Sequence, residues 1–536
     1  MADELLMSTL LSHHGAEDDI AVISEKGDVS FGQLNTYGRQ TAAWLLQNGI
    51  GQGDKVAVWL VNNVEWLALL FGAARIGATI VSVNTRYRAH EIEYLLEKSG
   101  AKMIVMQPGF RQIDFVGLVE QIDPANLPAL SKVAVVCDPG DALPEVLGLP
   151  SRRFCPKEAA PVAEDTEQDP ETPLILFTTS GTTSGPKLVE HNSRSLVLHS
   201  RRVALNEGMD KPGARVMASL PICGVFSLNA VLGALAGGAG VILMDTFDAA
   251  EFAKRFVRDA ATHAYGSDEM YDLIAEAAEG DNPFPAARRL GFASFHPDLD
   301  AFIGRMRAKN FPMIGLYGSS EVNALFALQK IDALDNERFQ AGGYPVSTAD
   351  VDVRVRDTET GAVLVSHQSG EIEIRGRTNF LGYLGDATAT AKAITEDGFF
   401  RTGDIGFMRE DGSFVYEGRG GDVLRLGGFL VSPAEIETLM NRLDDVAKVQ
   451  VVGVEIEGKT KAVAFVIPSE GAVPSPCALR DDMKRNIASF KVPEHIWLIE
   501  AFPVTHSSNG TKIQRAQLRQ IAMQRLEVEM NADNSS

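Results

Sequence analysis

The sequence has few cysteines, no long hydrophobic run and a shortage of basic residues, and each of these features excludes a class of protein. Its four cysteines, at positions 137, 155, 223 and 477, lie far apart without metal-like spacing. This usage indicates free thiols in a reducing compartment. The longest apolar stretch, residues 230–244, contains four glycines and is shorter than the ~20 residues that span a bilayer. No basic region precedes the short apolar stretch at the N-terminus, so we expect no secretory signal and a cytoplasmic protein.

The charge balance limits the kinds of partner. Lys and Arg number 50 against 71 Asp and Glu, which gives a formal net charge of −21. Because such a surface repels nucleic acid and anionic lipid, neither is an expected partner. The length of 536 residues suits two or three domains. The sequence does not reveal the oligomeric state, and a homodimer is the default expectation because two-fold dimers are the commonest oligomers.

A loop rich in hydroxyl groups and glycine follows an apolar run at residues 174–177, which predicts a buried strand. Residues 178–187 read TTSGTTSGPK. Gly181 and Gly185 permit backbone angles that a β-carbon forbids, and backbone N–H groups, hydroxyls and the Lys187 ammonium suit a polyanion. The loop is not a Walker loop, because only three residues separate the glycines, Pro186 interrupts Gly-Lys, and Leu188 replaces the magnesium-binding hydroxyl.

The patterns around this loop predict an α/β protein. Strand, helix and strand patterns at residues 55–60, 64–76 and 78–83 indicate parallel sheet with helices on both faces. Alternating apolar residues over 351–375 predict an antiparallel, barrel-like subdomain. Strand-like segments at 448–454, 462–467 and 492–498 predict a small C-terminal α+β domain. We place the N-terminal domain at 1–420 and the C-terminal domain at 421–536.

Four local expectations follow from shorter patterns. Residues 139–172, rich in Pro, Glu and Asp, predict an exposed connection. A helix over 193–205 would put Lys187 just before a helix N-terminus, where the dipole favours phosphate. Residues 315–322, GLYGSSEV, are expected between a strand and a helix. Ser432, Pro433 and Glu435 predict a capped helix start.

The phosphate-type loop resembles the signature TSGTTGxPKG of the adenylate-forming superfamily, which includes acyl-CoA synthetases, peptide-synthetase adenylation domains and luciferases. Ser184 and Leu188 are departures from that pattern. Further motifs follow in the family's order: GLYGSSEV resembles YGxTE, and FRTGD (400–404) with GRGGDVLRLGGFLVSPAEIE (418–437) resembles YRTGD and GRxxDxI…GxxVxPxEIE. Finally, PVTHSSNGTKIQR (503–515) resembles PxTxxGKIxR. The resemblance covers nearly the whole chain and implies a large adenylating domain followed by a small mobile one.

The resemblance also implies a site for ATP, Mg²⁺ and coenzyme A. It makes Lys512 the catalytic lysine, Glu321 the magnesium ligand and Lys187 a support for the departing pyrophosphate. The implied nucleotide- and CoA-binding residues are Thr179, Ser180, Gly181, Thr182, Thr183, Ser184, Gly185, Lys187, Tyr317, Gly318, Ser320, Asp404, Arg419, Gly427, Gly428 and Lys512. The implied hinge is Gly421, where the family usually has Asp or Lys. The candidate acid pocket consists of Cys223, Gly224, Phe226, Gly315 and Val322.

The implied reaction joins a carboxylic acid to AMP, releases pyrophosphate and transfers the acyl group to coenzyme A. Because the candidate pocket is small and apolar, an uncharged aromatic or aliphatic acid is favoured over an amino acid or diacid. Two alternatives stay open: an enzyme that loads a carrier-protein thiol, and a nucleotide-binding sensor that has lost catalysis. Cys223 is expected to pack rather than to act as a nucleophile, because no His/Asp partner pattern accompanies it.

Overall fold

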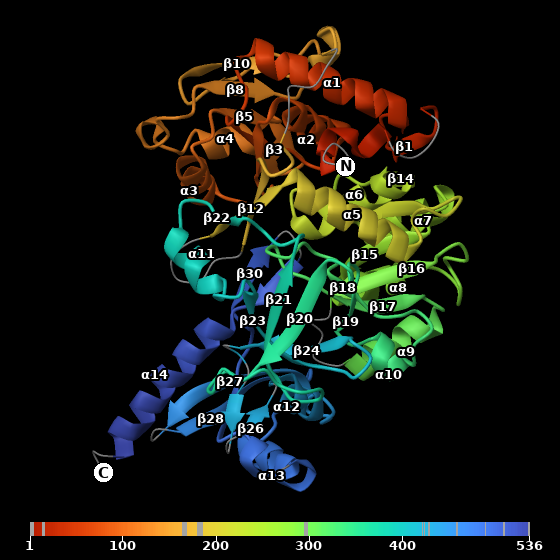
Figure 1. The fold of residues 1–536 in the computed structure, drawn as a ribbon. Coiled ribbons are helices and arrows are strands. Elements are labelled where there is room, and N and C mark those ends of the chain that lie inside the picture. The colour runs from red at the N-terminus through yellow and green to blue at the C-terminus, as the bar shows by residue number, and fades with distance from the viewer. Residues whose placement is uncertain are drawn as a thin grey trace.

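The chain forms two sheet-rich layers with helices between and around them, followed by a smaller C-terminal domain (Figure 1). The computed structural model describes residues 5–12, 17–162, 169–179, 186–293, 299–420, 422, 424–426, 429–431, 433–456, 459–487, 489–507 and 510–533. Among these residues, no helix has the length and apolar character needed to cross a membrane.

Among the described residues, the first sheet has nine strands in the order β22-β12-β11-β4-β3-β5-β8-β10-β9. Its strands are β3 (Lys55–Trp59), β4 (Thr79–Ser82), β5 (Met103–Met106), β8 (Lys132–Val135), β9 (Glu145–Val146), β10 (Leu149–Arg153), β11 (Pro173–Thr178), β12 (Leu188–Asn192) and β22 (Gly382–Tyr383). The predicted parallel pairing of β3 and β4 is confirmed. The prediction of a purely exposed connection over 139–172 is wrong in part, because β10 pairs in parallel with β8.

In the part of the chain that the structure describes, the second sheet has thirteen strands in the order β2-β1-β14-β13-β15-β16-β17-β18-β19-β24-β23-β21-β20. Its parallel part and short edge hairpin comprise β1 (Ile20–Ile23), β2 (Val29–Ser30), β13 (Arg215–Ala218), β14 (Gly240–Leu243), β15 (His263–Ser267), β16 (Arg289–Ala293) and β17 (Met313–Tyr317). Its antiparallel part comprises β18 (Ala327–Leu328), β19 (Gly342–Pro345), β20 (Val351–Arg356), β21 (Gly370–Gly376), β23 (Phe400–Met408) and β24 (Phe414–Arg419). The predicted antiparallel region is confirmed. It continues the large sheet through β19 and β24, and β20 is the edge strand among the described pairings.

The largest core lies between the two sheets. Four helices contribute to it: α1 (Phe31–Gln47), α2 (Val64–Ile76), α5 (Ser193–Glu207) and α6 (Val225–Gly237). Nearly every residue of α2 and α6 is buried, as expected of mostly apolar helices that lie inside a protein. The outer face of the first sheet is covered by α3 (Ala89–Ser99) and α4 (Phe115–Val119). The outer face of the second sheet is covered by α7 (Ala249–Arg258), α8 (Asp268–Ala277) and α9 (Leu299–Ala308). Two short helices, α10 (Asp335–Arg338) and α11 (Ala387–Ala393), follow later in the chain.

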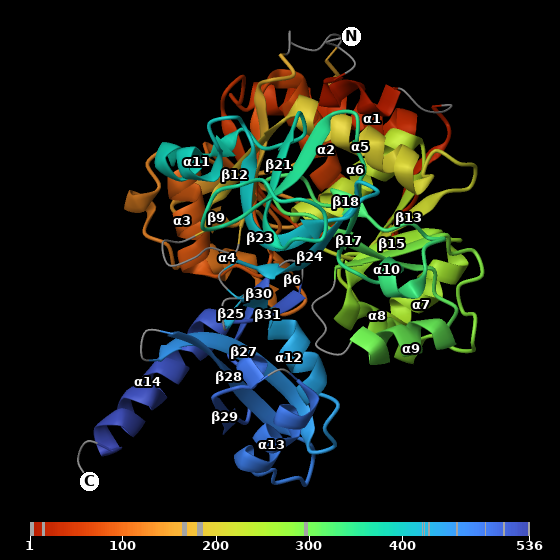
Figure 2. The same ribbon diagram turned by 60° about the horizontal axis from the view of Figure 1, so that its bottom comes forward.

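The C-terminal domain is built on the sheet β27-β28-β29. Its elements are β25 (Leu424–Leu426), β26 (Phe429–Val431), α12 (Pro433–Met440), β27 (Val446–Ile456), β28 (Lys459–Pro468), α13 (Pro476–Asn486), β29 (His495–Leu498), β30 (Val504–Ser507), β31 (Gly510–Ile513) and α14 (Arg515–Asp533). Figures 1 and 2 place the β30–β31 hairpin at the end of this domain that faces the rest of the molecule. The predicted α+β character is confirmed, whereas the proposed cap residue Ser432 and the boundary residue Gly421 lie outside the described residues.

Two local predictions are wrong. Strand β12 separates Lys187 from α5, so the helix begins about one strand length, roughly 16 Å of chain, beyond the lysine. Its dipole therefore does not act on this lysine as predicted. No helix follows Tyr317 either, because residues 318–326 form a loop in which Asn323 and Leu325 adopt left-handed angles, φ 64° and 63°.

Candidate active site

A buried carboxylate, Asp404, lies where β17 and β23 approach each other. The Tyr317 hydroxyl donates to Asp404 Oδ2 at 2.6 Å, and Arg419 on β24 forms an ion pair with Asp404 Oδ1 at 3.1 Å. Arg419 also donates to the carbonyl of Thr402 at 2.8 Å, which fixes its guanidinium beside the carboxylate. The structure thus brings together three residues that the motifs had placed 87 and 15 positions apart.

Two opposing effects act on Asp404. Burial raises the pKa of this carboxyl above its ordinary value, while the positive charge of Arg419 and the Tyr317 hydroxyl counteract the rise. A carboxylate offers about four lone-pair positions, so two protein donors leave room for two more. The arrangement can therefore accept a pair of hydroxyl groups, such as those of a ribose.

A second group gathers around Glu321, in the loop after β17. The Tyr383 hydroxyl on β22 donates to Glu321 Oε1 at 3.0 Å. The Lys187 ammonium lies over the ring of the same tyrosine, 4.4 Å from its centroid. One tyrosine side chain therefore contacts the Glu321 carboxylate through its hydroxyl and the Lys187 ammonium through its ring. Lys187 is the last residue of the loop that is predicted to bind phosphate.

The ends of the phosphate-type loop are joined by the backbone. Thr179 N–H donates to the carbonyl of Lys187 at 3.0 Å, so the loop connects the antiparallel strands β11 and β12. Residues 180–185, as well as Gly421, Gly427 and Gly428, lie outside the described residues. Lys512 lies in β31 opposite Thr505, and only its backbone is described.

Two buried histidines support the Glu321 loop, and no local sequence pattern identifies them as functional residues. His191 Nε2 donates to the carbonyl of Ser320 at 2.7 Å, and His199 Nε2 donates to the carbonyl of Ala324 at 2.7 Å. Burial lowers the pKa of each histidine to about 4, so both are neutral near pH 7. These two hydrogen bonds fix the backbone carbonyls of Ser320 and Ala324, which precede and follow Glu321 in the loop.

Packing explains two of the glycines in the motifs. A β-carbon on Gly318 would lie 2.7 Å from Cα of Ala324, and one on Gly315 would lie 2.1 Å from the carbonyl oxygen of Gln340. Both are distances that folded proteins avoid. The backbone of Gln340 therefore occupies the space that a side chain at position 315 would need. Ser320 contributes its backbone carbonyl, which accepts the hydrogen bond from His191.

Of the remaining candidate pocket residues, Cys223, Phe226 and Val322 are buried, and Gly224 is partly exposed. Cys223 precedes α6, Gly224 is its N-cap and Phe226 lies in its first turn. Val322 is fully buried beside Glu321. Burial raises the pKa of Cys223 to about 12, so this residue is a neutral thiol, as expected of a packing role.

Near Lys187, the described residues offer the carboxylate of Glu321 as a metal ligand, but not a complete set of protein ligands for a metal ion. No cluster of three or more His, Cys, Asp or Glu side chains that could hold a metal occurs among them. Magnesium commonly takes one or two carboxylates together with phosphate oxygens and water. Glu321 beside Lys187 fits that requirement when a nucleotide supplies the remaining oxygens.

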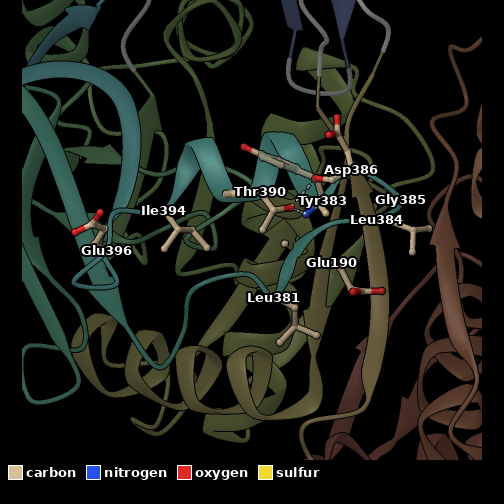
Figure 3. Close-up of a pocket in the computed structure, with 12 residues that line it drawn as sticks. Glu190, Leu381, Tyr383, Leu384, Gly385, Asp386, Thr390, Ile394 and Glu396 are labelled. Atoms are coloured by element: carbon tan, nitrogen blue, oxygen red, sulfur yellow. Dashed lines mark hydrogen bonds between the residues drawn. The ribbon is translucent and has the colours of Figure 1, made fainter.

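Tyr383 also borders an open hollow of about 840 Å³ between β12, β22 and α11 (Figure 3). Its apolar wall includes Leu381, Leu384 and Ile394, and Glu190 and Glu396 lie at its margin. Tyr383 is thus the point at which this hollow and the Lys187–Glu321 group meet.

Comparison with known proteins gives a consistent picture. Residues 12–384 match the family model described as AMP-binding enzyme, and residues 435–509 match the AMP-binding enzyme C-terminal domain. A putative acyl-CoA synthetase, YngI, from Bacillus subtilis is 29% identical over 92% of this chain and 91% of its own length. The mitochondrial medium-chain acyl-CoA ligase ACSF2 of Rattus norvegicus is 26% identical over 95% of this chain and 85% of its own.

The fold agrees with these matches. The crystal structure of the anthranilate CoA ligase AuaEII in complex with anthranoyl-AMP superposes with a TM-score of 0.81 at 22% identity, covering 97% of this chain and 98% of that one. The expected fold class is confirmed, and the expected class of enzyme, an AMP-forming acid–thiol ligase, agrees with the family match and with the names of these two relatives. The chain belongs to the family of AMP-binding enzymes, the adenylate-forming superfamily that its motifs resemble.

Proposed function

We propose that the chain is an acid–CoA ligase that activates an uncharged aromatic or aliphatic acid as an acyl-AMP and then transfers the acyl group to coenzyme A. The observation that carries the proposal is the proximity of two groups, because the charge of Glu321 acts on Asp404 and the charge of Arg419 acts on Tyr383. Asp404 with Arg419 suits a ribose, and Glu321 with Lys187 suits phosphates and a metal ion.

The chemistry requires two anions to meet, because the carboxylate of the acid attacks the α-phosphorus of ATP. Positioning and electrostatic stabilisation therefore dominate the barrier. Asp404 would bind the ribose, and Lys187 would hold the departing pyrophosphate. Glu321 would hold Mg²⁺, which supplies positive charge against the phosphate oxygens. The β30–β31 hairpin, which carries Lys512, lies at the end of the C-terminal domain that faces the N-terminal domain (Figure 2), which supports a role for this lysine as the cation at the α-phosphate.

The second half-reaction requires a different surface near the adenylate. We propose that the domain that follows Gly421 rotates about this residue, withdraws Lys512 and presents Gly427 and Gly428 to the pantetheine arm. The domain boundary at 420/421 is part of the same proposal. Successive conformations of this kind let one site serve two reactions.

The preference for an uncharged acid rests on the pocket candidates. Cys223, Phe226 and Val322 are buried and uncharged. The histidines behind the Glu321 loop are neutral, so they offer no charge to a second carboxylate. Two relatives have names that refer to acyl and medium-chain acyl groups, and a structural neighbour contains anthranoyl-AMP, which supports both aliphatic and aromatic acids as candidates.

The deciding experiment is a panel of carboxylic acids assayed for CoA-dependent AMP formation. Aromatic and medium-length aliphatic acids are expected to give AMP and the acyl-CoA in equal amounts. A parallel assay replaces coenzyme A with a phosphopantetheinylated carrier protein, and a faster reaction there would favour the carrier-protein alternative. ATP binding without pyrophosphate release for any acid would favour an inactive sensor.

A further inference from the structure

Tyr383 makes two contacts with two different parts of the proposed site. Its hydroxyl donates to Glu321 at 3.0 Å, and its ring lies under the Lys187 ammonium at 4.4 Å. We infer that Tyr383 is a positioning residue, which sets the metal-binding carboxylate with its hydroxyl and the phosphate-binding ammonium with its ring. The inference rests on the proposed function and adds a residue that the motif comparison did not assign.

Contacts other than these two fix the backbone of Tyr383. Strand β22 pairs with β12, and Tyr383 lies opposite Val189, two residues after Lys187. The Tyr383 N–H donates to Oγ1 of Thr390 on α11 at 2.9 Å, and the same hydroxyl donates to the carbonyl of Asp386 at 2.9 Å. A strand pair and a helix therefore hold the tyrosine in place independently of any ligand.

The hydroxyl contact orients Glu321. The bond engages Oε1 and, among the described contacts, leaves Oε2 to a metal ion. Bonds to charged acceptors are stronger than neutral ones, so this contact limits rotation of the carboxylate.

The ring contact orients Lys187. An ammonium over an aromatic face is attracted by the ring quadrupole, and this attraction needs no acceptor atom. The three ammonium donors therefore remain available to phosphate oxygens. A lysine on a flexible stem is held close to its working position in this way, without a carboxylate partner among the described residues.

The two contacts can be separated by substitution. Tyr383→Phe removes the hydroxyl and keeps the ring, whereas Tyr383→Leu removes both. For Tyr383→Phe we expect the half-saturating Mg²⁺ concentration to rise about 10-fold, with KM for ATP at saturating Mg²⁺ little changed. For Tyr383→Leu we expect the same metal effect and, in addition, a rise of about threefold or more in KM for ATP and for pyrophosphate in the reverse reaction.

The chain provides a matched control elsewhere. Tyr344 has Lys330 over its ring at 3.9 Å and donates its hydroxyl to Asp411 at 2.5 Å, the same pair of contacts on an exposed surface. Tyr344→Phe and Tyr344→Leu are expected to leave both metal and ATP dependence unchanged. Equal effects of the Tyr344 and Tyr383 substitutions would overturn the inference.

A binding measurement gives a readout that is independent of turnover. Mn²⁺ is titrated by electron paramagnetic resonance into the full-length enzyme with α,β-methylene-ATP, which cannot be cleaved at the reacting bond. We expect the Mn²⁺ Kd to rise about 10-fold in Tyr383→Phe. Wild-type binding with an unchanged Kd in Tyr383→Phe would overturn this inference alone. Absence of any Mn²⁺–nucleotide binding by the wild type would overturn the proposed function and this inference together.

Discussion

The Tyr317 hydroxyl donates a 2.6 Å hydrogen bond to Asp404, a residue 87 positions later in the chain. The tyrosine ring is also held by edge contacts with Phe414 and Phe326, at 5.2 and 6.4 Å between centroids. Tyr317 is thus fixed in the core by its ring and orients the carboxylate with its oxygen. This gives Tyr317 a role as support for Asp404, in addition to the nucleotide binding that the resemblance implies.

Tyr317→Phe is expected to weaken nucleotide binding without unfolding the site. The ring remains, but the buried carboxylate loses a donor, and a hydrogen bond to a charged group contributes about 1.5–3 kcal/mol. We expect KM for ATP to rise about 10-fold or more. Since the lost hydroxyl also lowered the Asp404 pKa, the acidic limb of kcat/KM for ATP should move to higher pH.

Steady-state kinetics across pH 5.5–8.5 check both effects. Tyr344→Phe removes a tyrosine–aspartate bond outside the site and should leave both measurements unchanged. An unchanged KM for ATP in Tyr317→Phe would show that Asp404 does not need this donor.

Lys512→Ala separates the two half-reactions. If this lysine serves the α-phosphate, the substitution should reduce acid-dependent ATP–pyrophosphate exchange by at least 100-fold, because a charge positioned for the transition state commonly contributes about 10²–10³ in rate. Reaction of pre-formed acyl-AMP with coenzyme A should be nearly unchanged. Lys484→Ala, which removes an exposed lysine paired with Asp481 on α13, serves as the control, and equal loss of both half-reactions would contradict the assignment.

The sequence predicted those parts of the fold that depend on local periodicity. The helix at 64–76 was placed to the residue, because α2 is apolar apart from Glu65 and Arg75 and is bounded by Asn63 and the left-handed Gly77. The antiparallel region and the C-terminal α+β domain were likewise predicted from alternation. In each case neighbouring residues in the chain are sufficient to specify the element.

The predictions that failed concern segments whose conformation depends on contacts with distant parts of the chain. After Tyr317, the expected helix is replaced by a loop because His191, His199 and Tyr383 bind its carbonyls and its carboxylate from other elements. Similarly, β12 extends before α5 because residues 188–192 pair with β11 on one side and β22 on the other. No local pattern in either segment records these partners, so the support of Glu321 could not be predicted.

Acidification should destabilise the protein between pH 6.5 and 4. Burial lowers the pKa of His191, His199 and His263 to about 4, whereas the unfolded chain titrates near 6.5. As the pH falls through this window, the unfolded state takes up protons that the folded state does not. Each histidine therefore lowers the free energy of unfolding by up to about 1.4 kcal/mol per pH unit.

Urea midpoints measured from pH 7.5 to 4.5 test this expectation. His263 lies away from the Glu321 loop. His263→Gln should remove about one proton from the uptake on unfolding, and so make the free energy of unfolding depend less steeply on pH. It should not alter the Mg²⁺ dependence of activity. A stability that is flat across this range would contradict the neutral state assigned to these side chains.

Glu207 should produce a dependence of the opposite sign. It is buried at the end of α5, where Tyr265 donates to its Oε2 at 2.8 Å. Burial raises its pKa to about 7, while its unfolded value lies near 4.3. Between these values the unfolded state is ionised and the folded state holds the proton, so this residue reduces stability as the pH rises from about 4.5 to 7, by up to about 3 kcal/mol.

Glu207→Gln removes this titration and keeps an oxygen that accepts the Tyr265 hydroxyl. The variant should match the wild type near pH 4.5 and be more stable at pH 8, so that the difference between their urea midpoints widens as the pH rises. Glu276→Gln, an exposed position on α8, should give a difference that does not widen. A Glu207→Gln protein that is less stable than the wild type at pH 8 would mean that the carboxylate is ionised in the folded state and is stabilised there by Tyr265 and Arg289.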